Sequence, residues 1–527
     1  MRQTGLAQTQ RKVGAQGVPL PAPVGGWDAI SPLANMPVDR AYQLDNWIPR
    51  PGWIEPRRGH IAWSTGMPGP VQSLMAYNGF GGTRKLFGIA GASIYDVTNQ
   101  GVASNTGAGV TGGPRFQHKM FSNASGTQYL IAVNGAMAPW LYDGTTWSNP
   151  SITGTGFDQT EFIQLNAHKG RLWFVPINAT YAVYMNTIGA VTGPATKYPL
   201  GELMTRGGYI TAIGTWTIDT RQTVDEYIAF ITSRGQIIVF QGTDPSTADT
   251  WLLVGIYDVG PPIGRRCFLR IAGDLLIITL DGVVPMSQML STDRAAANRV
   301  SITSIIMNKM AQSASLYQNN FGWEMIEYPK GTLAILNIPT QENSASVQYV
   351  MNTITGAWCQ FLGINSNCWE VDSADNIFFG GNGTVYKWDV GTGDDGADIT
   401  CTVKTAYNNF GNAAQLKRYT ALQSLITTTG TPIPAIGINV DFKENATLSQ
   451  AQPFTETIPR WDQVNLNEFN WPDLVSVTND WIAVLGEGHY VSIVGVITTS
   501  PNPNNPEATT ALQLNGWNIT AEHGGFI

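Results

Sequence analysis

A strand–turn–strand unit that recurs along most of the chain is the feature that most limits how this sequence can fold. Each unit has an apolar strand, a glycine turn and a second strand with an aromatic or β-branched centre, as in residues 86–91 followed by 94–97. The aromatic centres Tyr95 and Tyr142 are 47 residues apart, and Tyr142 and Tyr184 are 42 residues apart. Four-stranded propeller blades repeat at about 40–50 residues. The spacing therefore predicts a β-propeller.

The repeat extends from about residue 66 to residue 390 and becomes less regular around residues 286–330. It predicts about six blades, with seven as the other count that the spacing allows. A stack of β-sandwiches gives similar strand spacing, so periodicity alone leaves that alternative open. One helix is predicted at residues 294–312, which contain no glycine or proline and place apolar residues on one helical face.

The two ends of the chain have a different pattern. Residues 1–65 are irregular and rich in proline, and they contain too few apolar residues to form a core of their own. A cluster of glycine and aspartate at residues 391–396 marks a boundary, and strands with alternating apolar residues follow it. We therefore expect an all-β protein in three parts: an N-terminal extended segment at 1–65, a propeller at 66–395, and a β-sandwich-like platform at 396–527. The N-terminal segment is expected to dock on the platform and complete it.

Composition agrees with an all-β fold and argues against tight nucleic-acid binding. Charged residues make up 13% of the chain, against about 25% in typical domains. The 57 glycines and 30 prolines suit many short strands joined by tight turns. The formal net charge is −8, and basic pairs such as Arg57-Arg58 and Arg265-Arg266 are scattered. We interpret these pairs as solvated or ion-paired surface groups.

The cysteines and the hydropathy of the chain indicate where in the cell the protein folds and whether it spans a membrane. The four cysteines form no CxxC pair, so we expect reduced thiols in a protein that folds in a cytoplasm. The N-terminus lacks the apolar core of a signal peptide. No apolar run reaches the roughly 18 residues that a membrane helix needs. We therefore expect no membrane span.

The sequence contains no catalytic or metal-binding spacing that we recognise. No histidine lies within five residues of another, and neither HExxH nor GxSxG occurs. A glycosidase needs only two carboxylates at a suitable separation, and the candidates are Glu161, Asp225, Glu226 and Glu370. Any β-protein of this size offers similar carboxylates. We therefore predict a protein that is not an enzyme, with no catalytic residues, no cofactor and no metal.

Three further patterns are interpreted structurally. Residues 79–85 lack the spacing of a phosphate-binding loop and read as a hairpin turn. Asp394, Asp395 and Asp398 lack the spacing of a calcium loop and read as a solvated acidic turn. Five tryptophans in strand-like runs are interpreted as core residues rather than sugar-stacking platforms. These are Trp140, Trp173, Trp358, Trp369 and Trp388.

Four segments of the chain carry a family resemblance. The first is AYQLDNWIPRPGW at residues 41–53, followed by RRGH at 57–60. The second begins with GQIIVFQGTDP at 235–245 and continues through Trp251 and residues 259–266, 273–275 and 281–282. The third is MNTITGAW at 351–358, and the fourth is VKTAYNNFG at 403–411 with KRY at 417–419. In this ordered series the chain resembles the nozzle proteins of podovirus-type phage tails, also called tail tubular or head-completion proteins.

The resemblance implies a structural role in the virion. Proteins of this family form a homo-hexameric ring below the portal and adaptor, retain the packaged DNA and conduct it during ejection. A propeller would project along the channel, and a platform built from both chain ends would bind the adaptor. Tail fibre or needle proteins are further expected partners, and double-stranded DNA would pass through the lumen without sequence-specific contact. The protein would be made in the host cytoplasm and end in the phage tail.

Two other functions remain open at this point. A host-surface glycan-binding or glycan-cleaving propeller, such as a receptor-binding protein or depolymerase, is the main alternative. A neck adaptor or stopper is a third, although such proteins are commonly smaller and more helical. For assembly, we expect the segment with Trp47 and Trp53 and the region with Phe410, Lys417 and Arg418 to share the adaptor-facing platform.

Overall fold

The computed structural model describes residues 16–219, 224–271, 273–289, 301–429, 432–450, 476–478 and 481–526. The chain forms two compact units. The propeller unit comprises residues 58–397 and 501–508, and the platform unit comprises residues 1–57, 398–500 and 509–527. The expected all-β fold, a propeller with a platform made from the two chain ends, is confirmed.

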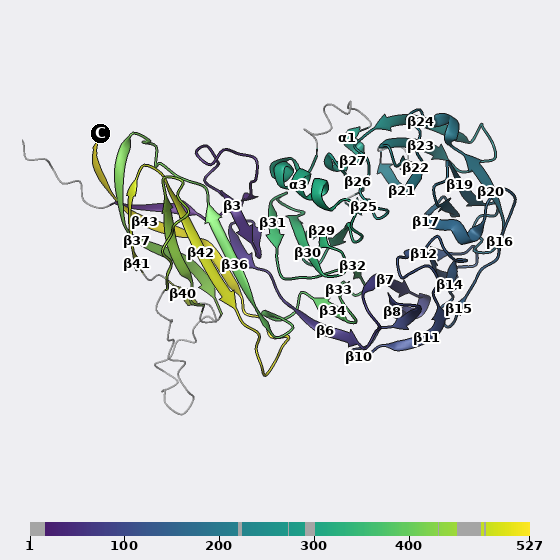
Figure 1. Ribbon diagram of the computed structural model, residues 1–527, viewed down its shortest axis with the longest axis horizontal. Coiled ribbons are helices and arrows are strands. Elements are labelled where there is room, and N and C mark those ends of the chain that lie inside the picture. Colours follow the sequence, from purple (N-terminus) through teal and green to yellow (C-terminus); the bar gives the residue numbers. More distant parts are fainter. Residues whose placement is uncertain are drawn as a thin grey trace, which may run out of the picture. The chain divides into compact units, whose positions relative to one another are not determined.

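The propeller unit consists of seven sheets in its described residues (Figure 1). The first blade contains β7 (Val71–Asn78), β8 (Arg84–Ala90), β9 (Ser93–Asp96) and β11 (Ser104–Gly109). The second contains β12 (Gln117–Ser122), β13 (Gln128–Val133), β14 (Trp140–Tyr142) and β15 (Trp147–Ser148). The third contains β17 (Phe162–His168), β18 (Arg171–Pro176), β19 (Tyr181–Met185) and β20 (Gly193–Pro199), with β16 (Ile152–Thr153) at its edge. The fourth blade contains β21 (Ile210–Asp219), β22 (Val224–Thr232), β23 (Gln236–Gly242) and β24 (Trp251–Asp258). The fifth contains β25 (Phe268–Ile271), β26 (Asp274–Thr279) and β27 (Gly282–Pro285). The sixth blade contains β28 (Glu324–Tyr328), β29 (Leu333–Gln341), β30 (Ala345–Asn352) and β31 (Trp358–Phe361). The seventh contains β32 (Cys368–Val371), β33 (Ile377–Gly380), β34 (Val385–Trp388) and β6 (His60–Thr65).

The first strands of successive sheets contact one another in the order β7, β12, β17, β21, β25, β28, β32 and back to β7. This closed ring makes the unit a seven-bladed propeller, so the blade number is the second of the two counts that the spacing allowed rather than the favoured six. Two features hid the seventh blade. The fifth sheet has three strands and is followed by helical segments, which stretches the repeat. The seventh sheet takes its outer strand from a distant part of the chain.

Strand β6 closes the propeller. It pairs antiparallel with β34, placing His60 opposite Trp388 and Ser64 opposite Val385. Two short strands lie beside it in parallel, β10 (Gly101–Val102) and β35 (Gly393–Asp394). The expected N-terminal segment 1–65 is therefore divided, because its last residues belong to the propeller and the unit boundary falls after Arg57.

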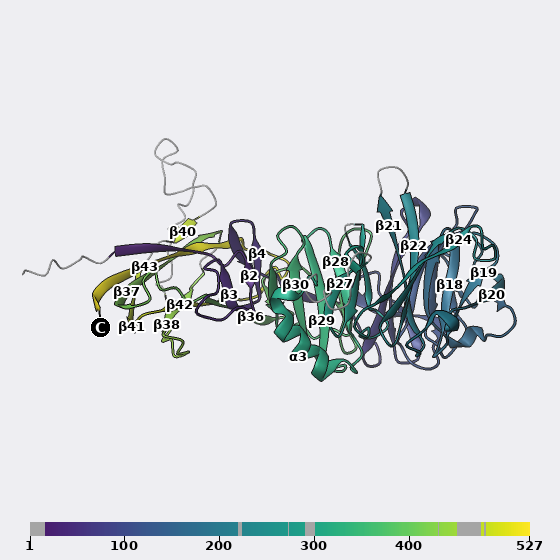
Figure 2. The same cartoon turned by 90° about the horizontal axis from the view of Figure 1, so that it is seen from above.

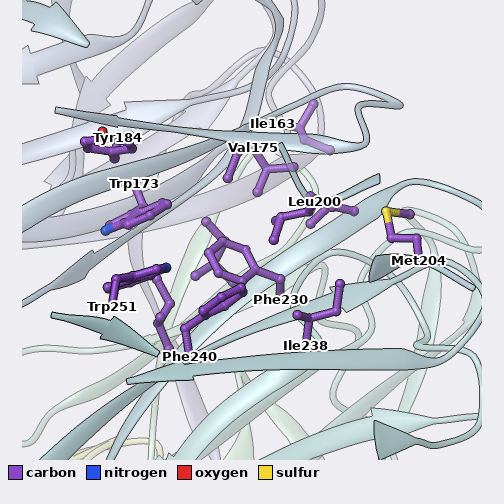
Figure 3. Close-up of a cluster of buried hydrophobic side chains, with 14 residues drawn as sticks. Ile163, Trp173, Val175, Tyr184, Leu200, Met204, Phe230, Ile238, Phe240 and Trp251 are labelled. Carbon is purple, nitrogen blue, oxygen red and sulfur yellow. The ribbon is translucent and has the colours of Figure 1, made fainter. Parts of the chain in front are cut away.

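Apolar faces packed between neighbouring blades form the propeller core. Every residue of β18 is buried, as expected for a strand covered on both faces. Between the third and fourth blades, Trp173 and Trp251 stack with ring centroids 5.4 Å apart, and Phe240 stacks on Trp251 at 5.4 Å (Figure 3). Truncating such a buried tryptophan to alanine typically costs about 3–5 kcal/mol. This packing holds the inner strands in fixed positions around the axis.

Residues 307–312 of the predicted helix are helical, and the observed helix continues to Tyr317. The structure has a helix α1 at Met286–Met289, a single 3₁₀ turn at Ser304–Ile306 and a helix α3 at Met307–Tyr317. Helix α3 contacts β29 and buries Met310 and Ala314. Residues 294–300 of the predicted helix lie outside the described residues.

The platform unit has two sheets. The first contains β4 (Trp47–Arg50), β5 (Trp53–Pro56), β43 (Leu512–Phe526), β37 (Gln415–Thr428) and β40 (Ser476–Thr478), with β1 (Gln16–Pro21) on β43 and β41 (Trp481–Gly488) on β37. The second contains β2 (Gly26–Trp27), β3 (Arg40–Asp45), β36 (Ala397–Thr405), β42 (Val491–Thr499), β38 (Ala435–Val440) and β39 (Ser449–Gln450). N-terminal strands pair with C-terminal ones in both sheets: Leu20 is opposite Trp517, and Leu44 is opposite Val403.

Alternating residues explain why these strands form layers. In β36, Ile399, Cys401 and Val403 are buried while Thr400 between them is exposed. The two sheets meet where Gly486 of β41 lies against Ile438 of β38. The platform is therefore a two-layered structure whose apolar faces point inward.

Candidate functional site

The first strands of the blades converge on a pocket at the propeller axis, which we call the axial pocket. It has a volume of about 260 Å³. Six of the seven first strands contribute lining residues, so the pocket lies where these strands meet. Its polar wall includes Gln117, His118, Gln164, Arg265, Glu324 and Glu370.

Arg266, which also lines this pocket, connects several blades. Its Nη1 donates to Glu324 Oε2 at 2.9 Å. Its Nη2 donates to the carbonyl of Gln72 at 3.0 Å, to Ser73 Oγ at 2.9 Å and to the carbonyl of Phe116 at 3.1 Å. The guanidinium therefore joins the first, second and sixth blades. Its five fixed N–H donors suit such a junction.

Glu324 is the buried partner of this network. Its carboxylate accepts from Arg266 and from the backbone N–H of Trp369. Burial raises the pKa of Glu324 above its ordinary value, and the Arg266 guanidinium opposes that rise. Two hydrogen-bonded partners hold this carboxylate in place. The geometry is that of a structural anchor rather than a free acid or base.

A histidine–glutamate contact lies in the wall of the pocket, and a further ion pair lies near Arg265. His118 Nε2 lies 3.5 Å from Glu370 Oε2. Arg115 pairs with Glu342 and also stacks over the ring of Phe321, with 4.5 Å to the centroid. Arg266 and Arg115 are thus each paired with a glutamate.

A separate group of charged and titratable side chains surrounds Glu226. Burial lowers the pKa of Lys119, and the positive charge of Arg270 lowers it further. Buried His168 bonds through Nε2 to the carbonyl of Gly242 at 2.9 Å, and its Nδ1 is 3.7 Å from Glu226. Burial lowers the pKa of His168.

Strands β21 and β22 project past their neighbours in the propeller (Figure 2).

The candidate glycosidase carboxylates do not gather in one place. Glu161 is exposed in a 3₁₀ turn, Gln159–Glu161, at the start of the third blade. Glu226 lies near His168 and Lys169, and Glu370 borders the axial pocket. The side chain of Asp225 lies outside the described part of the structure. Of the three candidates whose side chains are described, Glu370 alone lines the pocket.

The structure places the predicted core tryptophans and the predicted acidic turn, and the acidic turn differs from the prediction because Asp394 lies in β35 with a largely buried side chain. Trp173, Trp358, Trp369 and Trp388 are buried core residues, which confirms that prediction, and Trp140 is half-buried. In the acidic turn, Asp394 lies 3.0 Å from His60 Nδ1, and Asp395 accepts from the backbone N–H of Ala62. No group of three potential metal ligands occurs within the described ranges.

The five predicted assembly residues all lie in the platform unit. Trp47 is fully buried in β4, and Trp53 in β5 is half-buried and donates to Glu55 at 3.3 Å. Phe410 lies in the loop before β37 with φ of 51° and contacts the ring of Tyr419. Lys417 is fully buried in β37, whereas Arg418 beside it is exposed.

These residues occupy two ends of one sheet. Ile54, next to Trp53, is opposite Leu514 of β43, and Lys417 is opposite His523 of the same strand. Nine residues separate those two points, about 30 Å along an extended strand. The two regions therefore share the sheet but form no single cluster.

The axial residues Arg266, Glu324 and His118 were not found from the sequence. Arg265-Arg266 was noticed as a basic pair, but nothing in the linear pattern shows that its side chains enter the propeller axis. The one available signal was its position just before an apolar strand. The pairing of Arg266 with a glutamate 58 residues away depends on blade packing.

Comparisons with known proteins add the following. No family model matches the chain, and no curated protein matches it. Among solved structures, Raptor from Chaetomium thermophilum is 9% identical with a TM-score of 0.38, over 63% of this chain and 29% of that one. BBS1N in complex with ARL6DN is 10% identical with a TM-score of 0.38, over 63% and 97% of the two chains. An exo-β-1,3-galactanase from Phanerochaete chrysosporium is 10% identical with a TM-score of 0.23, over 77% of this chain and 100% of that one.

These similarities are too low to carry an argument about function. The chain spans less than a third of the Raptor chain that it matches. Within the described residues, no helix is both long and apolar enough to cross a membrane.

Proposed function

We propose that this chain is a structural subunit of a short phage tail. Copies would form the nozzle ring below the portal and adaptor, retain packaged DNA and conduct it during ejection. The observation that carries the proposal is the joining of two distant segments that resemble this family, residues 41–53 and 403–419. Ala41 is opposite Thr405 and Leu44 is opposite Val403 in the ladder of β3 and β36.

Side chains reinforce this junction. The rings of Tyr42 and Tyr407 stack with centroids 5.9 Å apart. Asn46 donates to the carbonyl of Thr400 at 2.8 Å, and Arg57 Nε donates to Asn46 Oδ1 at 2.8 Å. The resembling residues thus build one platform from both ends of the chain, which is the arrangement that the family resemblance implies. This agreement supports the proposal.

An exposed apolar strand supports contact between copies. Strand β24 is the outer strand of the fourth blade, and Leu252, Leu253, Val254 and Ile256 on it are 58%, 44%, 39% and 38% exposed. Natural proteins seldom leave a long apolar edge strand in water, because it invites pairing with other chains. We propose that a second copy of this chain covers β24 in the ring. A ring repeats one heterologous contact until it closes, so the neighbour would offer a different surface to this strand.

The charge of the chain suits a conduit. With −8 on each copy, a ring of six would carry a formal charge of −48. Phosphate binding depends on cationic side chains, so an acidic assembly holds DNA weakly and lets the duplex slide.

Copy number in the virion tests the proposal. Virions of the encoding phage are purified, and the chain is quantified by mass spectrometry against the major capsid protein. About six copies are expected. Absence from the virion, or a number that fits trimeric fibres, would overturn the nozzle and favour the glycan-active propeller, to be assayed by turnover of host surface polysaccharide.

A second measurement addresses the ring contact. Mass photometry of the purified chain mixed with the adaptor is expected to show hexamers. A Leu252→Lys/Val254→Lys variant should lose them while keeping its Tm, because those side chains are exposed in the single chain. The matched control is Leu485→Lys, at another exposed leucine on β41. Hexamers that survive the β24 substitutions would exclude this strand from the contact.

A further inference from the structure

We propose that the axial pocket binds a small hydroxylated carboxylate, such as a sugar acid, through Arg265 and Gln164. This inference is independent of the tail role, because it rests on the inside of a single propeller. Both residues line the pocket, Gln164 from β17 and Arg265 from the segment just before β25.

Arg265 supplies the site for the anionic group. It is half-buried, and no described residue forms an ion pair or hydrogen bond with it. Its two neighbours of the same charge are already neutralised, since Arg266 pairs with Glu324 and Arg115 pairs with Glu342. One guanidinium at the pocket therefore lacks a counter-ion. A guanidinium presents parallel N–H donors that match a carboxylate in a bidentate pair.

The surroundings of Arg265 make this unpaired charge costly. Burial lowers the pKa of Arg265, the nearby Tyr209 opposes that shift, and the positive charge of Arg115 lowers the pKa further. A partly buried charge is usually paired. An anion bound in the pocket would provide that pairing and relieve the repulsion from Arg115.

Gln164 supplies the site for a hydroxyl group. Its Oε1 is buried and finds no hydrogen-bond donor in the described structure. A buried amide oxygen without a partner loses about 1–3 kcal/mol of solvation. A ligand hydroxyl that donates to this oxygen would recover that loss. An anion without hydroxyl groups, such as acetate, would leave it unsatisfied.

The volume and the walls of the pocket limit the ligand. A volume of 260 Å³ corresponds to about nine water molecules at ~30 Å³ each. That space takes one monosaccharide-sized molecule. Leu74, Phe268 and Ile326 line the remaining wall and can cover the carbon skeleton of such a ligand. The combination of one cation, one acceptor and an apolar wall fits a hydroxy acid better than an inorganic anion.

Isothermal titration calorimetry with the full-length protein tests the proposal. The probes are D-glucuronate, D-glucose, acetate and sulfate at the same ionic strength. We expect saturable binding of D-glucuronate, with acetate and sulfate at least tenfold weaker and no binding of D-glucose. No saturation by D-glucuronate up to about 10 mM would overturn the proposal, and so would sulfate or acetate binding as tightly.

Three variants assign the contacts. Arg265→Gln should weaken D-glucuronate binding by about tenfold or more. Gln164→Leu should weaken D-glucuronate severalfold and leave the weak binding of acetate unchanged. Arg84→Gln, at an exposed turn of the first blade, is the matched control and should bind as the parent does. Binding that Arg265→Gln leaves intact, in a variant with an unchanged Tm, would place the ligand elsewhere and overturn the assignment.

Discussion

Lys417 shows how much a single polar side chain can contribute inside the platform. It is fully buried, and its Nζ donates to the carbonyls of Asn412 at 2.6 Å, Gln415 at 3.0 Å and His489 at 3.3 Å. Three backbone acceptors thus surround one ammonium group, tying the loop before β37 to the turn before β42. Burial lowers the pKa of Lys417.

Replacing this lysine should destabilise the platform. Lys417→Met keeps the length of the side chain but leaves the three carbonyls without their donor, and we expect a loss of about 2 kcal/mol or more. Arg418→Met is the control, because Arg418 is exposed and such changes usually stay within about 0.5 kcal/mol. Thermal unfolding of the two variants measures the difference. Equal Tm values would show that the bonds to Lys417 add nothing net.

Because His168 is buried, we expect the propeller to lose stability in acid. Its pKa is lowered by burial, whereas the unfolded chain has the ordinary value of about 6.5. Above that value the imidazole is neutral in both states. As the pH falls below 6.5 the unfolded state binds a proton first, so stability falls until the folded pKa is reached, by at most about 1.4 kcal/mol for each pH unit.

The variant His168→Gln should remove this dependence, because glutamine has no titrating group and can still donate to Gly242. We expect the drop in Tm between pH 7.5 and pH 5.5 to be smaller in this variant by about 1–2 °C. His489→Gln, at a part-exposed histidine of the platform, serves as the control. If His168→Gln and the parent lose equal stability in acid, another group is responsible.

For single residues, the sequence predicts which apolar side chains are buried better than it predicts which polar side chains are buried. The tryptophans in strand runs were predicted to be core residues, and most are. Lys417, by contrast, was predicted to take part in assembly, and its neighbour Arg418 gives no local signal that the two differ. A lysine is buried only where tertiary structure brings acceptors to it, and that information is spread over residues 412–489.

Among the elements, strands paired through short turns were predicted and β6 was not. The pairs β8–β9 and β22–β23 join residues close in sequence, so glycine turns and apolar runs reveal them. Strand β6 pairs with β34, more than 300 residues away, and its own residues give no clue to that partner. The blade count depended on this strand and on the three-stranded fifth blade, so it was underestimated.

The role of β6 in closing the propeller can be tested by substituting Ala62. Its backbone N–H donates to Asp395 Oδ1 at 3.1 Å, and it lies opposite Tyr386 in the ladder. Ala62→Pro removes the N–H, whereas Ala62→Thr at the same position keeps it and suits a strand. We expect the proline variant to lose about 1–3 kcal/mol of propeller stability and the threonine variant almost none.

Hydrogen exchange locates the effect of Ala62→Pro. Amides of β33 and β34 should lose protection, while those of β22 and β23 in the fourth blade should keep more of theirs. Uniform loss across all blades would mean that the ring opens as one cooperative body. Unchanged protection in β34 would show that β6 is dispensable for closure.

For the whole molecule, the sequence indicated the parts but not what they assemble into. Strand alternation and the family resemblance both indicated a platform made from the two chain ends, and the ladders of β1 with β43 and β3 with β36 have that form. The number of copies depends on surfaces that a single chain leaves exposed, such as β24. Those surfaces have no periodic signature in the sequence.

The proposed conduit predicts that the assembled protein binds duplex DNA poorly. The chain has 38 acidic and 30 basic residues, and two of the arginines in and near the axial pocket, Arg115 and Arg266, are engaged in ion pairs rather than free to meet phosphate. Proteins with a basic groove bind non-specific DNA with a Kd of about 10⁻⁴–10⁻⁶ M at physiological salt. Fluorescence anisotropy with a labelled 30-base-pair duplex in 0.15 M NaCl should give no saturation below about 100 μM of ring. A Kd in the micromolar range that weakens steeply with salt would reveal a cationic lining, and the duplex would then be gripped rather than allowed to slide.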